Sequence, residues 1–381
     1  MKKYLFTALI LVLSLSQVIS QAIIINHQTA TLSSIPDNWI DSAKVKLKVT
    51  YQHTSHGSQL VSGIEAIEVT YGGVYNFTSS DYGLDPSVFL NDYGMPGAPD
   101  LGHNGDLAWR DATFEILNDP DCNRNVVIWS WCGGVSDNDS AGIYAYLNAM
   151  SELEVNYPDV QFVYMTGHLD GSGASGNLNQ MNNLIRNYCV ENEKILFDFA
   201  DIESYNPDGG QNYMEWCALD GLNYDSTCNN PWDGPNWGAE WVAANPEHSY
   251  VTVAGNCASC AHSSDPAEAK LNCVLKGNAF WWLLARLAGW NPNVGISTGN
   301  ADNKHINIYP NPSSGRIIIQ SDNDYINEVF IFNALGSKVM SRKINNRKKS
   351  VTLNLSGYCK GNYFVRVNTG KSGYTKKIVV P

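Results

Sequence analysis

The sequence predicts an α/β protein with a doubly wound, mostly parallel sheet, followed by a small C-terminal β-sandwich. Three observations predict this architecture. Apolar β-branched runs alternate with helical segments between residues 45 and 288, which is typical of parallel sheets. Residues 305–381 contain seven short strand patterns separated only by turns, which favours a sandwich. Charge also changes sign, because residues 21–300 have 10 Lys and Arg against 33 Asp and Glu, whereas residues 301–381 have 13 against 4.

The elements of the main domain follow from the spacing of their apolar residues. Val45, Leu47 and Val49 alternate with lysines, which predicts a strand over residues 45–51, and a helix is expected to begin near Ser58. Further strands are predicted at 126–129, 160–165, 195–199 and 250–254, and helices at 141–155, 178–188 and 266–288. The polar run 137–140 is interpreted as a helix cap in preference to a calcium site.

The chain is divided into four segments. Residues 1–20 have the lysines and apolar run of a signal peptide, residues 21–290 form the main domain, residues 291–304 are a Pro, Gly, Ser and Asn-rich linker, and residues 305–381 form the sandwich. No segment after the signal has the length and apolarity of a membrane span. The acidic main domain would repel phosphates, which argues against a nucleic-acid partner. We therefore expect an exported chain without a membrane span in its mature form.

Nine cysteines in an exported chain predict disulfide bonds. Eight lie in the main domain, a number that would permit full pairing there, and Cys359 lies in the tail. Cys257 and Cys260 form a single Cys-x-x-Cys pair, with no second pair at zinc-finger spacing and no adjacent haem-site histidine, so disulfide bonding is preferred to metal binding. The sequence leaves the connectivity open.

The tail carries a set of motifs that identifies it. They are Ile308-Tyr309-Pro310-Asn311-Pro312 with Gly315, and the segments 329–336, 355–357, 361–367 and 376–380. In these motifs the tail resembles the C-terminal sorting domain of the type IX secretion system. The resemblance implies a protein that is secreted or held at the cell surface, the outer-membrane type IX secretion machinery as its partner, and a tail without chemistry. An ordinary ligand-binding sandwich is the alternative.

Polar residues, including four of the eight histidines, follow the predicted strands, where parallel sheets bind ligands. They are His53, Ser55, His56 and Ser58 after the first strand, Trp131, Cys132 and Gly133 after the second, His168 and Asp170 after the third, Asp201 after the fourth, and His262 after the fifth. His103 lies in a further Gly-rich loop. Loops are commonly polar, but histidine is scarce in this chain, so we expect these side chains to form one functional site.

This arrangement is similar to the SGNH or GDSL hydrolase superfamily, whose nucleophile follows the first strand and whose general-base histidine precedes the last helix. The resemblance implies Ser55 as the nucleophile, with His262 taking its proton, in an esterase acting on acylated carbohydrate. The family's Gly-Asp before the serine is replaced by His53-Thr54, and its aspartate before the histidine is replaced by Ser259.

The remaining roles are assigned by residue chemistry. Asp170 is the chosen triad acid and Asp201 the reserve, while His53 or His168 could polarise the carbonyl. Backbone N–H groups at Gly57, Ser58 and Gly133 are expected to stabilise the oxyanion. Ser58 competes as a nucleophile but also suits a helix cap. The other substrate-binding candidates are His56, Trp131 and His103, and neither a metal nor a cofactor is required.

Two other functions stay open. His53, His56 and His168 with an aspartate could hold a metal, or a His/Tyr pair could act, in an enzyme that cleaves polysaccharide. A non-catalytic surface protein could instead bind glycans at the same residues. Residues 205–241 carry seven Tyr and Trp side chains, interpreted first as the packing of a long loop and second as a stacking surface for sugars.

Overall fold

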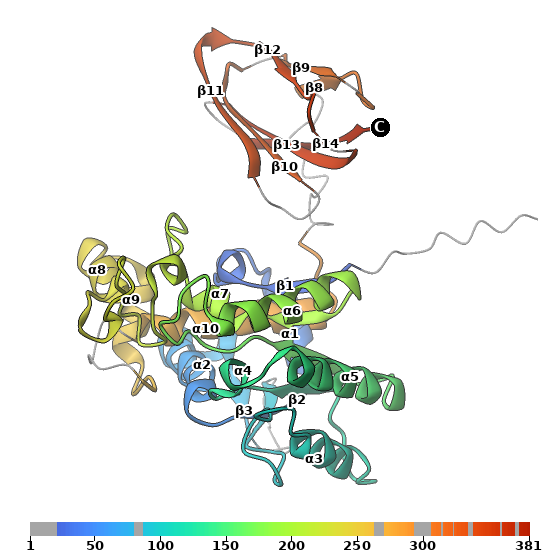
Figure 1. Ribbon diagram of the computed structural model, residues 1–381, viewed down its shortest axis with the longest axis vertical. Coiled ribbons are helices and arrows are strands. Elements are labelled where there is room, and N and C mark those ends of the chain that lie inside the picture. The colour runs from blue at the N-terminus through green and yellow to red at the C-terminus, as the bar shows by residue number, and fades with distance from the viewer. Residues whose placement is uncertain are drawn as a thin grey trace, which may run out of the picture. The chain divides into compact units, whose positions relative to one another are not determined.

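Seven parallel strands form the sheet of the main domain (Figure 1). The computed structural model describes residues 21–79, 87–262, 270–292, 306–313, 315–322, 324–333, 338–358, 360–369 and 373–381. The strands are β1 (Ile23–Ile25), β2 (Lys48–Gln52), β3 (Phe77–Thr78), β4 (Val88–Asp92), β5 (Val126–Trp129), β6 (Gln161–Met165) and β7 (Ile195–Phe197). Their order is β1-β7-β6-β5-β2-β4-β3. Every neighbouring pair is parallel, which confirms the predicted α/β class with a parallel sheet.

Two groups of helices pack beside this sheet. One contains α1 (Asp37–Lys46), α2 (Ser58–Tyr71) and α10 (Leu271–Leu287), and the other α3 (Ala108–Leu117), α5 (Ser140–Asn156) and α6 (Asn177–Glu191). The shorter helices are α4 (Gly134–Asp137), α7 (Phe199–Glu203), α8 (Trp237–Ala244) and α9 (Ser249–Asn256). Parallel strands joined by right-handed crossovers place the two groups on opposite faces, because the chain moves along the sheet in opposite directions in the two cases. The sheet is therefore doubly wound.

Strand β2 marks the point where the direction of winding reverses. It pairs with β4 on one side and with β5 on the other, although β5 follows β4 in sequence. In open parallel sheets, the carboxyl ends of the strands at such a reversal form the ligand-binding crevice. The turn after Gln52 lies there, as expected from the sequence.

The structure corrects the predicted elements in three places. The strand predicted over residues 45–51 is β2, which begins at Lys48. Val45 instead belongs to helix α1 and has 77% of its surface exposed. Residues 250–254 are not a strand, because they lie in α9, whose start is capped by the side chain of His248. Strands β1, β3 and β4 were not predicted. Asp139 caps α5 by accepting a hydrogen bond from the Gly142 N–H at 3.0 Å, which confirms the helix cap proposed for residues 137–140.

Helices α2 and α10 touch through glycine. A Cβ atom on Gly63 would lie 1.9 Å from the carbonyl oxygen of Cys273, and one on Gly277 would lie 2.6 Å from the carbonyl carbon of Gly63. Only glycine permits backbones to approach so closely. The contact holds the N-terminal halves of the two helices beside each other.

The tail forms two antiparallel sheets. Its strands are β8 (Ile306–Tyr309), β9 (Arg316–Ser321), β10 (Ile326–Asn333), β11 (Lys338–Lys348), β12 (Ser350–Asn354), β13 (Gly361–Thr369) and β14 (Gly373–Val380). One sheet has the order β11-β10-β13-β14 and the other β12-β9-β8. Alternate residues such as Val365 and Val367 are buried in a core of their own, which confirms the predicted sandwich. The chain divides into compact units at residues 290 and 291.

No helix in the described parts of either unit is both long enough and apolar enough to cross a bilayer.

Candidate functional site

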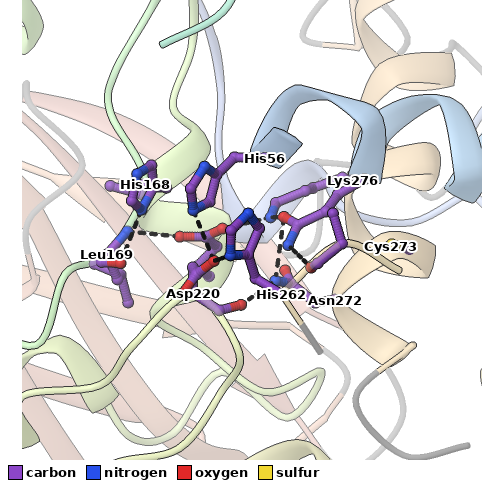
Figure 2. Close-up of polar contacts among 12 residues, drawn as sticks. His56, His168, Leu169, Asp220, His262, Asn272, Cys273 and Lys276 are labelled. Carbon is purple, nitrogen blue, oxygen red and sulfur yellow. Dashed lines mark hydrogen bonds and ion pairs between the residues drawn. The ribbon is translucent and has the colours of Figure 1, made fainter. Parts of the chain in front are cut away.

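Three histidine rings from distant parts of the main domain form a stack (Figure 2). His56 lies on the turn between β2 and α2, His168 follows β6, and His262 lies before α10. The His56 and His168 ring centroids are 3.4 Å apart and their planes differ by 6°. The His56 and His262 centroids are 3.9 Å apart, with planes 7° from parallel. Three of the predicted site residues are therefore brought together, with His56 as the shared ring.

Both ring nitrogens of His56 have partners. The Nε2 atom lies 2.9 Å from Oδ2 of Asp220, and the Nδ1 atom lies 3.3 Å from the sulfur of Cys132. Asp220 is buried and also lies 3.8 Å from Nδ1 of His262. Cys132 is a free, half-buried thiol that follows strand β5. A thiol, an imidazole and a carboxylate thus lie in a line, which is the arrangement of a nucleophile, a base and the acid that orients it.

The contacts of the line shift two pKa values in the direction that nucleophilic chemistry needs. Burial alone would lower the pKa of His56, but Asp220 and Cys132 outweigh burial and raise it to about 9. The contact with His56, aided by the hydroxyls of Thr54 and Ser55, lowers the pKa of Cys132 to about 7. Between these two values the pair exists mainly as thiolate and imidazolium.

The two outer rings of the stack have lowered pKa values. Burial and the nearby charge of His56 lower the pKa of His168, and the same two causes lower that of His262. Nδ1 of His168 lies 3.0 Å from the carbonyl oxygen of Leu169, which holds the N–H on that nitrogen. His262 has a positive φ of 60°, a strained conformation of the kind found at functional sites.

The turn that carries His56 needs glycine after it. A Cβ atom at Gly57 would lie 2.3 Å from the Cβ atom of His53 and 2.4 Å from the hydroxyl of Ser130. The phenol of Tyr51 donates a hydrogen bond of 2.9 Å to the Gly57 carbonyl. The strand before the turn and the strand β5 beside it therefore determine where His56 lies.

A buried polar network supports the backbone next to the stack. Lys276 contacts both Glu203 and Gln59, and all three side chains are fully buried. Glu203 accepts a hydrogen bond from the N–H of Leu169, beside His168, at 2.8 Å. Two other side chains also bind the backbone near the stack. Gln59 donates to the Ala261 carbonyl at 2.6 Å, and Asn272 donates to the Asp220 carbonyl at 2.7 Å. One network thus positions the backbone beside His168, Asp220 and His262 (Figure 2).

Two disulfides close the loops that carry Asp220 and His262. Cys217 bonds to Cys228 across the first loop, and Cys260 bonds to Cys273 across the second. Cys132, Cys257, Cys122 and Cys189 are free thiols, so the eight cysteines are not fully paired. Disulfide bonding was correct for Cys260, but Cys257 is free. Cys359 lies outside the described residues.

Ser55 and Ser58 lie on the rim of the stack. Ser55 is exposed, and its hydroxyl contacts the thiol of Cys132. Ser58 donates a hydrogen bond of 2.6 Å to the carbonyl of Ser55 and provides no side-chain cap for α2, which begins at this residue after Gly57. Gly133 directly follows Cys132 and has a positive φ of 80°.

Other predicted residues have partners of their own. His53 is buried with Nε2 2.7 Å from Asp92, and Nδ1 of His103 lies 2.6 Å from Asp137. Asp170 accepts hydrogen bonds from the backbone and hydroxyl of Ser172 at 2.9 and 2.5 Å. The indole of Trp131 is buried and donates to the Met165 carbonyl, and Asp201 lies 2.5 Å from His27.

Cys132 was expected at the strand end but without a catalytic role, and Asp220 was not predicted as a site residue. Cys132 follows strand β5 at Trp131-Cys132-Gly133, a position where a nucleophile is expected, but the cysteine count favoured disulfides. Asp220 lies in a loop without periodicity, so no sequence signal placed it beside His56. The predicted aromatic loop is mainly packed, with Tyr213, Trp237 and Trp241 buried.

A metal would find three donor atoms in the stack. Ligand atoms of His56, Asp220 and His262 all lie within 4.8 Å of one another. This set contains two imidazoles and one carboxylate, which suits zinc. It differs from the predicted set, because His53 faces Asp92 instead.

Comparisons with known proteins identify the tail. Residues 307–381 match the family model described as the secretion system C-terminal sorting domain. The protein is therefore secreted or held at the cell surface, and its tail interacts with the type IX secretion machinery. No curated protein matches the chain in sequence.

Similarity to solved structures is low. A duf3244 family protein with an immunoglobulin-like β-sandwich from Bacteroides vulgatus is 15% identical with a TM-score of 0.16, over 19% of this chain and 84% of that chain. The sulfur carrier protein SoxY from Chlorobium limicola is 19% identical with a TM-score of 0.17, over 21% and 81%. An endo-beta-1,4-mannanase double mutant from Cellulomonas fimi is 11% identical with a TM-score of 0.19, over 94% and 99%. These scores carry no argument about function.

Proposed function

We propose that the main domain is a secreted acyl hydrolase that uses Cys132 as its nucleophile and acts on esterified carbohydrate. The observation that carries the proposal is the line of contacts from Cys132 through His56 to Asp220. The shifted pKa values of Cys132 and His56 support it, because they favour the reactive thiolate near neutral pH.

The reaction follows from these contacts. The Cys132 thiolate attacks the ester carbonyl carbon, a C–S bond forms, and the C–O bond to the alcohol breaks. His56 gives its proton to the departing alkoxide, so that an alcohol leaves and a thioester remains. His56 then takes a proton from water, whose oxygen attacks the thioester carbonyl carbon. The C–S bond breaks, the acid leaves, and the Cys132 thiolate and the protonated His56 are restored. Asp220 orients His56 throughout and stabilises its cationic form.

Ser55 is the rival nucleophile. The SGNH-like hypothesis assigns the attack to Ser55 and the base to His262, with Asp170 as the acid. Ser55 lies beside Cys132, so either side chain would act at the same place. The contacts of Cys132 with His56 favour the thiol, because a base within reach of the nucleophile is what activates it.

A carbohydrate substrate is supported by location and charge. The sorting tail exports the domain to the surface or beyond, where polysaccharides are available. The acidic main domain disfavours polyanions, so a neutral acylated glycan is the preferred substrate. A non-catalytic glycan-binding protein is the alternative from another class.

A labelling experiment tests the nucleophile. The mature protein is treated with iodoacetamide and with a fluorophosphonate probe, and acetate release from acetylated xylan is measured. For Cys132→Ala we expect loss of activity and of low-concentration iodoacetamide labelling, whereas Ser55→Ala should retain most of both. Fluorophosphonate labelling and activity lost only in Ser55→Ala would assign the nucleophile to Ser55, and sugar binding without acetate release would leave a lectin.

Metal-dependent hydrolysis is the second candidate, because His56, Asp220 and His262 place three donor atoms together. Dialysis against a chelator, followed by zinc addition, distinguishes it. Activity that disappears with the chelator, returns with zinc and persists in Cys132→Ala would favour the metal. Activity unchanged by the chelator would favour the thiol.

A further inference from the structure

We propose that a second site, a polar cleft beside His27 and Tyr205, binds a neutral oligosaccharide. The cleft has a volume of about 430 Å³, within the range of small-ligand sites. Its polar and aromatic lining includes His27, Gln28, Tyr205, Asn206, Asp208 and Tyr250. This inference does not depend on the proposed catalytic function.

The cleft lies at the edge of the sheet formed by β1 and β7, away from the strand reversal at β2. His27 follows β1, and its partner Asp201 lies in α7, directly after β7. These strands are paired at one edge of the sheet, whereas the histidine stack follows β2 and β6. Both sites therefore use the carboxyl ends of strands, but different ones.

Two neighbouring residue pairs separate the cleft from the stack. Ile202 and Leu275 line the cleft. The next residues in sequence, Glu203 and Lys276, belong to the buried network that supports the stack. Helices α7 and α10 thus lie between the two sites.

The cleft has rigid aromatic surfaces. The rings of His27 and Tyr205 stack with centroids 3.7 Å apart and planes 20° from parallel. Asp201 holds His27 in place through both its ring Nδ1, at 2.5 Å, and its backbone N–H, at 2.9 Å. Tyr250 is fixed by a 3.1 Å hydrogen bond to the Ala30 carbonyl. Flat rings held in this way suit the C–H face of a sugar.

The polar groups of the cleft suit sugar hydroxyls. Asp208 accepts a hydrogen bond from the indole of Trp241 at 3.1 Å, which fixes its carboxylate at the rim. Asn206 and the exposed Gln28 add amides that both donate and accept hydrogen bonds. The described lining contains the Asp208 carboxylate but neither lysine nor arginine. The carboxylate of a uronate would be repelled by Asp208 and would find no lysine or arginine to bind in the described lining. We therefore assign the cleft to neutral sugars.

Binding is measured by calorimetry on the mature protein, with linear hexasaccharides of β-1,4-glucose, β-1,4-mannose and β-1,4-xylose and with a hexauronate. Cys132 is alkylated first, so that the proposed catalytic site takes no part. We expect at least one neutral hexasaccharide to bind and the hexauronate to bind at least tenfold more weakly. In Tyr205→Ala, the dissociation constant of the neutral sugar should rise at least tenfold.

Two further variants keep the test decisive. Gln28→Trp places a bulky side chain on an exposed rim position and should block binding without disturbing the core. Trp232→Ala removes an aromatic ring that is 73% exposed but is not part of the cleft lining, and it should leave binding unchanged. The proposal is overturned if none of the neutral sugars binds, if Gln28→Trp binds as the wild type does, or if Trp232→Ala alone abolishes binding.

Discussion

Of the His–Asp pairs at the carboxyl edge of the sheet, the pair His56–Asp220 and the pair His27–Asp201 differ in their surroundings. His56 and Asp220 are both buried, and the His56 ring is stacked between two other imidazoles and contacts the thiol of Cys132. His27 and Asp201 are partly exposed, stacked on Tyr205 and beside an open cleft. The contact distances are similar, at 2.9 and 2.5 Å. A His–Asp contact therefore does not by itself mark a catalytic centre, and the neighbouring nucleophile and the burial of the pair are what distinguish the two.

The largest expected effect on stability comes from the buried Lys276–Glu203 ion pair, which belongs to the network beside His56 and Asp220. Lys276→Met leaves the fully buried Glu203 carboxylate without its cationic partner, so we expect the free energy of unfolding to fall by about 3–5 kcal/mol. Asp201→Asn, in the partly exposed pair, should cost less than about 1 kcal/mol. Urea unfolding followed by tryptophan fluorescence measures both, because all eleven tryptophans lie in the main domain. The double variant Lys276→Met with Glu203→Gln should recover part of the loss, and equal losses in Lys276→Met and Asp201→Asn would contradict the comparison.

The next largest effect is expected on the catalytic rate, where replacing Asp220 and replacing Asp201 should have different consequences. Asp220→Asn removes the charge that orients His56, and we expect kcat/KM for ester hydrolysis to fall on the order of 10³-fold. Asp201→Asn is the matched control and should change kcat/KM by less than about threefold, because the cleft takes no part in the chemistry. Steady-state rates on acetylated xylan decide between these outcomes. A larger loss of kcat/KM in Asp201→Asn than in Asp220→Asn would indicate that the catalytic centre lies at the cleft.

The support beneath the stack can be weakened through the helix contact. Gly63→Ala forces α2 away from the Cys273 carbonyl, so we expect a loss of about 1–3 kcal/mol in the free energy of unfolding. Gly255→Ala in α9 meets no atom within 4 Å and serves as the control. A Gly63→Ala protein as stable as Gly255→Ala would show that the helices can separate without cost.

The pH profile gives the smallest expected effect. Because the pKa of Cys132 is lowered to about 7, the thiolate is lost as pH falls through 7, and kcat/KM should then drop about tenfold per pH unit. Above about pH 9, His56 loses the proton that it gives to the leaving alcohol, so the rate should fall again. Rates measured from pH 5 to 10 check both limbs, and a serine nucleophile would instead give activity that only rises with pH as its base loses a proton.

The sequence predicted the parallel sheet through four of its seven strands, because buried parallel strands appear as continuous apolar runs such as 126–129. It also predicted the four longest helices, α2, α5, α6 and α10, but not the shorter ones. The segment 250–254 was misread because Tyr-Val-Thr-Val has strand composition, whereas the cap at His248 and packing against α2 make it helical. His56 and His168 were found because they follow strands whose carboxyl ends converge. His262 was included partly because it follows the mispredicted strand 250–254 and partly because the resemblance implies a histidine before the last helix. The proposed role of Cys132 and the position of Asp220 were missed because the partner of a side chain in an irregular loop depends on tertiary contacts alone.

The cysteines of the main domain link the proposed activity to the place where it is needed. Two disulfides close the loops of Asp220 and His262, whereas Cys132 must stay reduced to act as a nucleophile. Disulfides form outside the reducing cytoplasm. We therefore expect a newly made chain to carry an unfinished site until export, so that the producing cell is not exposed to the proposed hydrolytic activity.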